Sequence, residues 1–381
     1  MNLELTEEQK LIQQTVREFA ESEVKPLAKE IDETHRFPME TVKKAGELGF
    51  LGVCVPQEYG GAGLDNIAYS IVIEEISRVC ASTGAILSVN NSLFCDPVLH
   101  FGTEEQKKKF LVPFARGEKL GCYALTEPQA GSNAAALKTT AVGRGDKYVL
   151  NGTKIWITVG GVADAAIVYA MTDITKGEKG ISAFIVEKGT PGFKVGKEEK
   201  KLGINATACV ELIFDNCEIP ATNLVGKESE GYKIALATLD GGRIGIAAQA
   251  TGIAQGAFEE ALKYAQQRIA FNQPIAKFQA IQFMLADMAT EIDAARLLTR
   301  RAAYMADTKP RFSLEASVAK LFASEMATRV THKAIQIHGG YGYSREYPVE
   351  RMYRDARITE IYEGTSEIQR MIIAAWVLRQ Y

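Results

Sequence analysis

The sequence predicts an α+β protein in which a β-domain lies between two helical regions. Three observations predict it: a helical period of apolar residues up to about residue 120, short β-branched and aromatic runs from about 121 to 235, and long alanine-rich segments after that. A chain of 381 residues is long enough for two or three domains. We therefore expect an N-terminal α-helical domain over 1–120, a middle β-domain over 121–235 and a C-terminal four-helix-type domain over 236–381.

The N-terminal region opens with a helix signal. Thr6 and Gln9 have the spacing of a capping box, and apolar residues then recur at helical spacing from Leu11 until Pro26. Further amphipathic stretches follow, interrupted by the glycine-rich segment 57–63. This segment predicts a turn and not a phosphate-binding loop, because no Lys-Ser/Thr pair follows it.

In the middle region, short runs of strand-forming residues alternate with turn residues. The run 148–150 ends at Asn151-Gly152, a pair typical of tight turns, and further runs cover 166–170 and 181–186. From about residue 236 the helical period returns, over 244–263, 281–307 and 314–336.

Composition excludes several classes of protein. A net charge of −3 and a pI near 6.0 argue against a basic surface that holds nucleic acid. Six cysteines without a CxxC pair and four scattered histidines show no zinc spacing, so we expect no metal, and free buried thiols in a reducing compartment. No apolar run has membrane-spanning length. The first five residues lack the features of a leader, which predicts a cytoplasmic protein, with a mature organellar form as the alternative.

The run 361–370, Ile-Tyr-Glu-Gly-Thr-Ser-Glu-Ile-Gln-Arg, has the composition of an active site. It places the carboxylate of Glu363 beside Gly364, where a ligand can approach the backbone closely, and hydroxyls and a second acid follow. By itself the run also fits a loop entering a helix, with Thr365 or Ser366 as the N-cap.

Other motifs occur in a fixed order along the chain. They are Tyr123-Ala124-Leu125-Thr126-Glu127-Pro128 with Gly131-Ser132, the run 151–158 (Asn-Gly-Thr-Lys-Ile-Trp-Ile-Thr), Gln266-Gln267-Arg268 through Phe278-Gln279, and the run 336–342 (Gln-Ile-His-Gly-Gly-Tyr-Gly). Together with the run 361–370 they resemble the acyl-CoA dehydrogenase family over essentially the whole chain, and its short-chain, butyryl-type members most closely. The expected order of helices, sheet and helices matches that family's architecture. The resemblance also implies a homotetramer built through the C-terminal helices.

The resemblance implies FAD-dependent dehydrogenation of an acyl-CoA thioester. A base takes a proton from the α carbon while hydride leaves the β carbon for N5 of FAD, because no side chain accepts a hydride. The chain has no convincing GxGxxG at the start of a βαβ unit, which disfavours a nicotinamide cofactor. The implied electron acceptor is an electron-transfer flavoprotein.

Glu363 matches the family's catalytic base. Related enzymes with a relocated base have a glutamate immediately before the arginine of the segment 239–243, and this chain has Gly242 there, so the assignment stays with Glu363. Burial would raise the pKa of this carboxylate towards working pH. A backbone N–H near Glu363, with a flavin hydroxyl, would hold the developing enolate oxygen.

The resemblance further implies the ligand contacts. The residues that match the isoalloxazine site are Tyr123, Leu125, Thr126, Ser132, Trp156, Ile157 and Thr158. Arg268 matches a pyrophosphate ligand. The adenosine and phosphate contacts, delivered partly from a neighbouring subunit, match Phe278, Gln279, Gln336, Gly339 and Gly340, and further FAD contacts match Thr365 and Glu367.

On the substrate side, Asp240 and Arg243 match CoA ligands, and Ser132 and Gly364 match contacts near the pantetheine and thioester. Tyr232 and Tyr362 are candidates for the lining of the acyl pocket, and both also fit ordinary packing.

Two positions depart from the short-chain pattern. Val159 follows the run 151–158 where the family commonly has asparagine, which suggests a local packing change. Asp96, after Cys95, stands in a segment that lines the acyl pocket in the family, and an ionisable group there is costly unless it is paired or used. Asp96 is a helix-break or cap acid before Pro97, a second base, or, with a saturated substrate, a group that excludes long apolar chains.

These observations leave several functions open. The leading hypothesis is an FAD-dependent dehydrogenase for a short or compact, even alicyclic, acyl-CoA. A second is 1,4-dehydrogenation of a cyclic enoyl-CoA, such as a cyclohexene carboxyl-CoA, to a dienoyl-CoA, with Asp96 taking a γ proton. An oxidase that passes electrons to oxygen, and a flavin-containing nucleic-acid-binding protein, are further alternatives. The acidic net charge and the presence of Glu363 disfavour the last.

Overall fold

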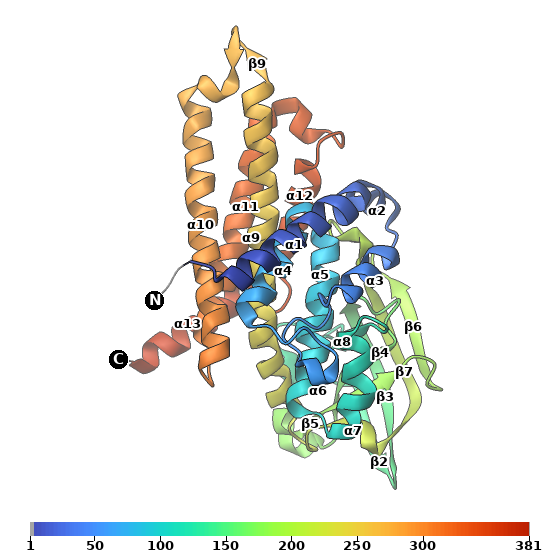
Figure 1. Cartoon of the computed structure of the whole chain (residues 1–381). Helices are drawn as coiled ribbons and strands as arrows, with labels where there is room; N and C mark the ends of the chain where they lie inside the picture. Colours follow the sequence, from blue (N-terminus) through green and yellow to red (C-terminus); the bar gives the residue numbers. More distant parts are fainter. Residues whose placement is uncertain (1–3, 381) are drawn as a thin grey trace.

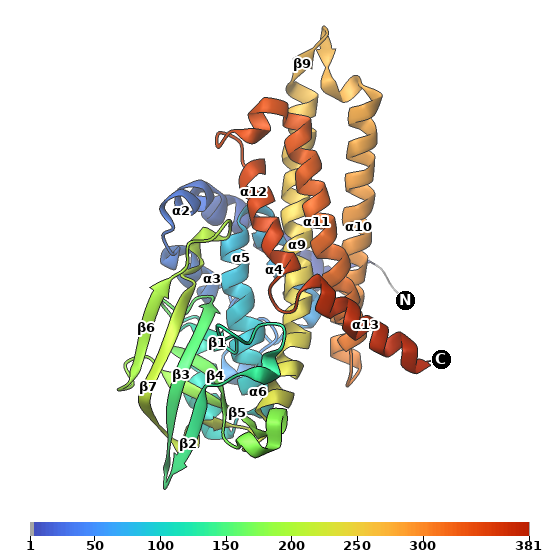
Figure 2. The same ribbon diagram turned by 180° about the vertical axis from the view of Figure 1, so that it is seen from behind.

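Helices, a sheet and a second set of helices follow one another along the chain, and the predicted α+β fold class is confirmed (Figure 1). The computed structural model describes residues 4–380, so Met1, Asn2 and Leu3, which entered the expectation of a chain without a leader, lie outside the described residues. The sheet occupies one end of the molecule and the long C-terminal helices the other, with the N-terminal helices packed between them (Figures 1 and 2).

The N-terminal region is helical and begins with the predicted capping box. Thr6 Oγ1 accepts the N–H of Gln9 at 3.2 Å, and Gln9 Oε1 accepts the N–H of Thr6 at 3.1 Å. The α-helices are α1 (Glu7–Phe19), α2 (Ala28–Thr34), α3 (Met39–Glu47), α4 (Asn66–Val79), α5 (Ala81–Ser88), α6 (Asp96–Phe101), α7 (Glu104–Gln106) and α8 (Val112–Ala115). Between them lie the short 3₁₀ and π segments η1 (Ala20–Val24), η2 (Lys25–Leu27), η3 (Gln57–Tyr59), η4 (Val89–Cys95) and η5 (Lys107–Leu111).

The middle region is one twisted sheet. Its strands are β1 (Gly121–Ala124), β2 (Thr140–Arg144), β3 (Lys147–Ile157), β4 (Ala165–Met171), β5 (Ile181–Glu187), β6 (Phe193–Glu198), β7 (Val210–Pro220) and β8 (Leu224–Val225). They lie in the order β6-β7-β3-β2-β4-β5-β8, and β1 pairs in parallel with β4. The 3₁₀ turns η6 (Ala134–Ala136), η7 (Ile174–Gly180), η8 (Asn205–Thr207) and η9 (Ala221–Asn223) connect them.

The turn expected at Asn151-Gly152 is wrong, because β3 continues through both residues. The register of β3 against β7 shifts between Leu150 and Gly152, which marks a β-bulge. Gly152 packs directly on Thr139, and a side chain at this position would overlap it. The glycine serves close packing within the sheet.

The C-terminal region is built from long helices whose buried contacts are mainly alanines. Its helices are α9 (Gly231–Gln267), α10 (Gln279–Thr308), α11 (Ser313–His338), α12 (Val349–Ala356) and α13 (Ser366–Gln380), with 3₁₀ turns η10 (Ile275–Lys277), η11 (Gly339–Tyr343) and η12 (Arg357–Glu360). A small hairpin of β9 (Ile269–Ala270) and β10 (Gln273–Pro274) joins α9 to α10. Because α9 begins at Gly231, its first turn lies within the range expected for the middle domain.

α9 links the regions, since it packs against α4 of the N-terminal region and against α10 and α11 of the C-terminal region. One apolar cluster joins the N-terminal helices to the sheet, and a second fills the C-terminal bundle. None of the described helices is long and apolar enough to cross a membrane. The six cysteines are free thiols, and all but Cys54 are buried.

Candidate active site

Glu363 lies in a sharp turn between η12 and α13. Both Glu363 (φ +53°) and Gly364 (φ +97°) have left-handed backbones, a conformation that a glutamate adopts only when its surroundings hold it. Gln369 Nε2 donates to the carbonyl oxygens of Glu363 at 3.3 Å and Gly364 at 2.9 Å. The turn is therefore fixed from α13, whose N-cap is Thr365: its Oγ1 accepts the N–H of Ile368 at 3.4 Å.

The carboxylate of Glu363 lies against α9 at Gly242, where the absence of a side chain leaves room for it. A methyl group on Gly242 would overlap Glu363 Oε2 and would lie 2.9 Å from Glu363 Cδ and 3.0 Å from Leu93 Cδ2. Among the described residues, Glu363 Oε2 is buried without a hydrogen-bond partner. Burial raises the pKa of Glu363 to about 7, although the positive charges of Lys320 and Arg243 oppose the rise. A carboxyl with this pKa can accept a proton near neutral pH.

A second glycine of α9, Gly245, is also in close contact with side chains of the N-terminal helices. A methyl group on Gly245 would overlap the Tyr69 hydroxyl and Ser88 Oγ, which hydrogen-bond each other at 3.0 Å. One turn further, the Tyr362 hydroxyl donates to Gln249 Oε1, and Gln249 Nε2 donates to the carbonyl of Ala81 at 3.0 Å. Tyr362 thus has a polar partner, and the fully buried Gln249 closes this end of the site.

Asp240 and Arg243 are bound to each other one helical turn apart on α9. Arg243 Nη1 lies 2.6 Å from Asp240 Oδ1, and the Ser313 hydroxyl donates to Asp240 Oδ2. Arg243 Nε is buried without a partner among the described residues. The pair borders Glu363, since the charges of Arg243 and Glu363 act on each other's pKa. Tyr232 lies at the start of α9, against the apolar cluster that contains Phe94 and Tyr169.

The residues expected around the isoalloxazine ring are clustered where β1 and β3 end. The N–H of Ile155 donates to the carbonyl of Thr126 at 2.9 Å, which joins the loop after β1 to β3. Trp156 follows with a left-handed backbone (φ +61°) and a half-exposed indole. The structure thereby brings together Tyr123, Leu125, Thr126, Trp156, Ile157 and Thr158, while Ser132 lies in an exposed loop nearby.

A buried ion pair fixes this cluster, and sequence reasoning missed it. Lys154 Nζ lies 2.8 Å from Glu127 Oε1 and donates to the carbonyl of Leu125 at 3.0 Å. Glu127 also accepts the backbone N–H groups of Lys138 at 2.6 Å and Thr139 at 2.9 Å. Burial would raise the pKa of Glu127, but Lys154 and these hydrogen bonds lower it, whereas burial lowers the pKa of Lys154. The pair thereby joins β3 to the loop after β1 and to the segment that precedes β2.

Val159 departs from the family's asparagine at a left-handed position (φ +68°). This conformation suits asparagine better than a β-branched residue. Val159 is buried in the core cluster of the sheet, and its N–H donates to the carbonyl of Thr207 at 2.8 Å. These contacts fit the packing change expected from the sequence.

The residues expected to contact the pyrophosphate and adenosine lie away from Glu363, around the opposite end of α9, whereas Thr365 and Glu367 lie at the start of α13. Arg268 caps its C-terminus and stacks on Tyr341, 5.6 Å from the ring centroid. Arg268, Gly339 and Gly340 line an open groove of about 660 Å³. Phe278 and Gln279 open α10, and Gln336 lies near the end of α11. Roughly 25 helical residues separate Arg268 from Arg243, a distance of about 37 Å along α9, so one chain does not unite the two groups of contacts.

Asp96 is not a helix-break or cap acid, so that interpretation is wrong. The chain stays helical from η4 into α6, and Asp96 itself has φ −59° and ψ −53°. The wide π turn of η4 accommodates Pro97, which lacks an N–H donor. Asp96 Oδ1 lies 3.1 Å from His100 Nδ1, and its hydrogen bond and charge raise the pKa of His100 to about 9. The Asp96 side chain is about one-third exposed.

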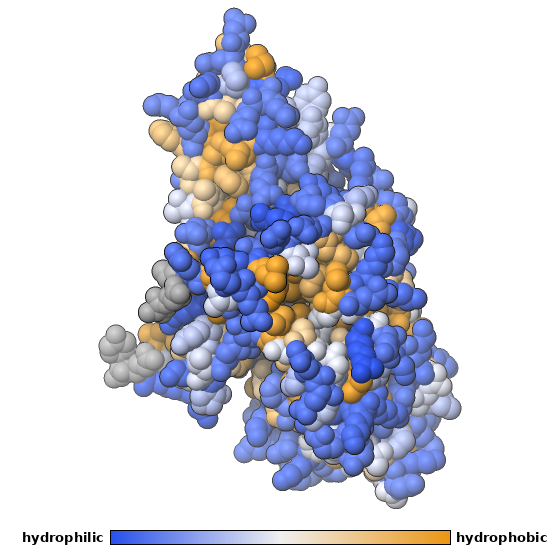
Figure 3. Space-filling view, in the orientation of Figure 1, coloured by the Kyte–Doolittle hydropathy of each residue, from blue (hydrophilic) through white to orange (hydrophobic). Residues whose placement is uncertain are grey.

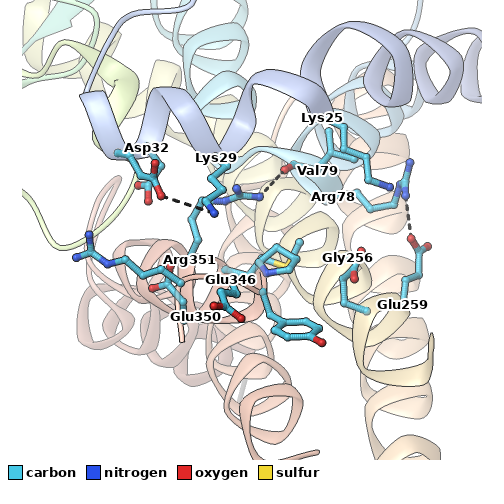
Figure 4. Close-up of a pocket in the computed structure, with 16 residues that line it drawn as sticks. Lys25, Lys29, Asp32, Arg78, Val79, Gly256, Glu259, Glu346, Glu350 and Arg351 are labelled. Carbon is cyan, nitrogen blue, oxygen red and sulfur yellow. Dashed lines mark hydrogen bonds and ion pairs between the residues drawn. The ribbon is translucent and has the colours of Figure 1, made fainter. Parts of the chain in front are cut away.

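A separate pocket of about 220 Å³ lies between η2 and α2 on one side and α9 and α12 on the other (Figure 4). Its walls are charged, but the buried groups have partners. Arg78 Nη1 lies 2.8 Å from Glu259 Oε2, and Arg351 Nη2 donates to the carbonyl of Val79 at 3.1 Å (Figure 4). This pocket belongs to the ionic contact between the N-terminal and C-terminal regions.

Comparison with known proteins gives the same family along the chain. The models described as acyl-CoA dehydrogenase N-terminal, middle and C-terminal domains match residues 6–118, 122–217 and 229–378. The short-chain specific acyl-CoA dehydrogenase of Clostridium acetobutylicum is 55% identical over 100% of both chains. The chain belongs to the acyl-CoA dehydrogenase family.

Solved structures agree with this assignment. Butyryl-CoA dehydrogenase from Megasphaera elsdenii superposes with a TM-score of 0.98 at 46% identity, covering 99% of this chain and 100% of the other. An acyl-CoA dehydrogenase complexed with FAD from Bacillus anthracis has a TM-score of 0.93 at 40% identity, covering 99% of this chain and 68% of the other. The expected resemblance to short-chain, butyryl-type members of the acyl-CoA dehydrogenase family is confirmed.

Proposed function

We propose that this acyl-CoA dehydrogenase converts a short-chain acyl-CoA to the enoyl-CoA, with Glu363 as the base. The observation that supports it most directly is Glu363 Oε2, a buried oxygen without a hydrogen-bond partner among the described residues, which lies against Gly242 of α9 in a carboxyl group whose pKa is about 7. The named relatives act on short acyl-CoA substrates according to their descriptions. We therefore assign the reaction as an oxidation of a CH–CH bond.

FAD fits the residues present and supplies the hydride acceptor when bound. Around the first turn of α13, Glu363 Oε2, Ser366 Oγ and Gln369 Oε1 are buried polar atoms without partners among the described residues. The half-exposed Trp156 and the backbone after β1 form the other side, with Thr365 and Glu367 at the start of α13. These residues, with those after β1 and β3, would hold the isoalloxazine end of the cofactor.

In this mechanism Glu363 removes one proton from the α carbon as a hydride leaves the β carbon, so the C–C single bond becomes a double bond and the carboxylate becomes a carboxylic acid. A backbone N–H of the Glu363 segment would donate to the thioester oxygen as negative charge develops on it. Gly364 lets the thioester approach the turn closely. We assign CoA binding to Asp240 and Arg243, with Ser132 nearer the pantetheine.

The walls of the site favour a short acyl chain. Gly245 is in close packing with Tyr69 and Ser88, and the hydrogen bond between Tyr362 and Gln249 closes the site one turn beyond. A long chain would have to displace these buried hydrogen-bonded groups, which is costly. We therefore place the acyl chain against Gly245 and Tyr362, and Tyr232 at the edge of the site.

The decisive experiment is anaerobic bleaching of the bound flavin with a panel of straight, branched and alicyclic acyl-CoA thioesters. We expect fastest bleaching with butyryl-CoA and much slower bleaching with chains of eight or more carbons. Equal or faster bleaching by an alicyclic thioester would contradict the short-chain assignment. Reoxidation by an electron-transfer flavoprotein, and not by oxygen with release of peroxide, would identify the physiological acceptor and exclude the oxidase alternative.

A second candidate, 1,4-dehydrogenation of a cyclic enoyl-CoA with Asp96 as base, has one supporting observation. Two aromatic residues connect Asp96 with the site. The charge of Asp96 contributes to raising the pKa of the buried Tyr169, and the ring centroid of Tyr169 lies 5.0 Å from that of Tyr123. The ion pair with His100 gives Asp96 a structural role as well. The short-chain reaction needs no base at this position.

We predict that Asp96→Asn changes kcat for butyryl-CoA by less than about threefold, because Glu363 takes the only proton of that reaction. The ion pair with His100 is partly exposed and contributes about 0.2–1 kcal/mol. Steady-state kinetics on butyryl-CoA and on a cyclic enoyl-CoA, with His100→Gln as the control for the broken pair, test this. Loss of activity on the cyclic substrate in Asp96→Asn alone would instead favour the second candidate.

We further propose that the flavin site is shared between subunits of a homotetramer. Arg268 and Glu363 lie too far apart to contact one flavin within one chain, so Arg268 would serve the site of a neighbouring copy. α13 projects from the body in both views, and an apolar patch covers the upper part of α10, where Phe283 is exposed (Figures 1, 2 and 3). Both features favour further chain-to-chain contacts. The cytoplasmic location expected from the sequence stays a prediction.

If the flavin site is shared between subunits, two variants that are inactive alone should regain activity when their chains are assembled together. Arg268→Ala should lose flavin, and Glu363→Gln should lose turnover while it keeps flavin. When the two are unfolded together and reassembled, some sites receive Glu363 from one chain and Arg268 from another, so about a quarter of wild-type activity should return if mixing is random. Absence of any recovery, with mixed assemblies verified by mass spectrometry, would show that the two residues serve the same chain.

A further inference from the structure

Lys320 is a fully buried lysine close to the catalytic turn. It lies on α11, its exposed fraction is 0%, and its neighbours on the same helix face are the buried alanines 316, 319 and 323. Burying an ammonium group is costly, and burial lowers the pKa of Lys320 to about 8. A lysine in such a position needs a reason that an apolar residue could not supply.

The contact that Lys320 makes is with the backbone of the catalytic turn. Its Nζ donates to the carbonyl oxygen of Gly364 at 2.7 Å, the same oxygen that accepts the Gln369 amide at 2.9 Å. Lys320 forms no ion pair within 4.0 Å with an acid among the described residues. The left-handed pair Glu363-Gly364 is therefore held from α11 as well as from α13.

The charge of Lys320 acts on Glu363 more strongly than any other charge does. Lys320 is the first of the two groups that lower the pKa of Glu363, and Arg243 on α9 is the second. The charge of Glu363 also contributes to raising the pKa of three tyrosines, which are Tyr69 on α4, Tyr123 on β1 and the adjoining Tyr362. Around Lys320 the other charged groups are Arg243, Glu360 on η12 and Glu367 on α13.

We propose that Lys320 is a positioning residue for the base: its ammonium group anchors the Glu363-Gly364 turn through the Gly364 carbonyl and increases the fraction of Glu363 that is ionised near neutral pH. This inference rests on the proposed role of Glu363. An uncharged amide could hold a carbonyl oxygen equally well, so the charge has a separate effect, which is electrostatic support of the anionic base. After proton transfer Glu363 is neutral, and the same charge favours return of the proton to solvent.

The test compares Lys320→Gln, Lys320→Met and Lys320→Arg, with Lys333→Gln as the control. Lys333 lies on the same helix but pairs at the surface with Asp287 and Glu291. Loss of the charge should move the rising limb of kcat/KM with pH upward by about one unit, which lowers kcat/KM roughly fivefold at pH 7 and leaves it near wild type above about pH 9. Lys320→Arg and Lys333→Gln should keep the wild-type profile.

A second measurement follows the protonation of the Glu363 carboxyl group directly, without catalytic turnover. The infrared carbonyl band of a protonated buried carboxyl, identified by its absence in Glu363→Gln, is titrated with pH in each variant. Its midpoint should rise by about one unit in Lys320→Gln and Lys320→Met. An unchanged midpoint and profile in a folded variant would overturn the inference; Lys320→Met replaces Lys320→Gln if the amide unfolds the helix. A wild-type protein that is not bleached by any acyl-CoA would instead refute the proposed function.

Discussion

Glu363→Gln is expected to reduce turnover of butyryl-CoA by about 10²–10⁴-fold, the usual contribution of a general base. The amide has nearly the shape of the carboxylate, so it fits beside Gly242, but it cannot accept the α proton. Single-turnover bleaching of the flavin by butyryl-CoA measures the effect on the chemical step itself.

Two controls separate this result from misfolding or loss of cofactor. Flavin content and thermal midpoint should stay near wild type, because Glu363 Oε2 makes no hydrogen bond among the described residues that the amide would lose. Glu105→Gln, an exposed change of the same kind on α7, should leave turnover unaltered. Near-normal bleaching in Glu363→Gln would remove this residue from the mechanism.

If Glu363 is the base, its pKa determines how kcat/KM of the wild-type protein depends on pH. Burial raises the pKa of Glu363 to about 7, and only the ionised form can take a proton, so kcat/KM should rise through pH 7 and level off above it. At pH 6 the rate should be about tenfold below the plateau, since about a tenth of the carboxyl groups are ionised one unit below the pKa. A flat profile between pH 5.5 and 8 would mean that another group sets the rate.

Local signals were enough to predict the order of the regions and the main catalytic candidate. The capping box of Thr6 and Gln9 is complete within four residues, and the structure shows it as expected. Glu363 stands in a contiguous motif whose residue types indicate its chemistry. The period of apolar residues changes twice along the chain, which predicted the position of the sheet between helices.

Non-local packing decided what the sequence did not reveal. Asn151-Gly152 has the composition of a turn, but pairing of β3 with β7 and the contact with Thr139 make it a bulge. Lys320 resembles an ordinary helix-surface lysine, and only the packing of α11 against the turn after η12 shows that it is buried. Gln249 was missed for the same reason. The signal available for Lys320 was its place on an alanine-rich face.

Lys154→Met is expected to lower the free energy of unfolding by about 3–5 kcal/mol, the usual cost of breaking a buried ion pair at one end. The methionine fills much of the space, but Glu127 is then buried with a negative charge whose main counter-ion is gone. Urea denaturation monitored by circular dichroism measures this loss of unfolding free energy, taken from the first unfolding transition. Lys138→Met is the matched control, because the Lys138 side chain is exposed and only its backbone N–H contacts Glu127.

The double variant Lys154→Met with Glu127→Gln distinguishes the uncompensated charge from lost packing. If the charge is the cause, the double variant should recover part of the stability that Lys154→Met loses, because the uncompensated charge is gone. Recovery should be incomplete, since Lys138 and Thr139 donate to different oxygens of Glu127 and the amide keeps only one acceptor oxygen. Recovery of stability should not restore flavin affinity fully, since Lys154 also holds the carbonyl of Leu125 in the loop assigned to the isoalloxazine ring. A double variant as unstable as Lys154→Met, with normal flavin affinity, would show that Lys154 acts by filling space alone.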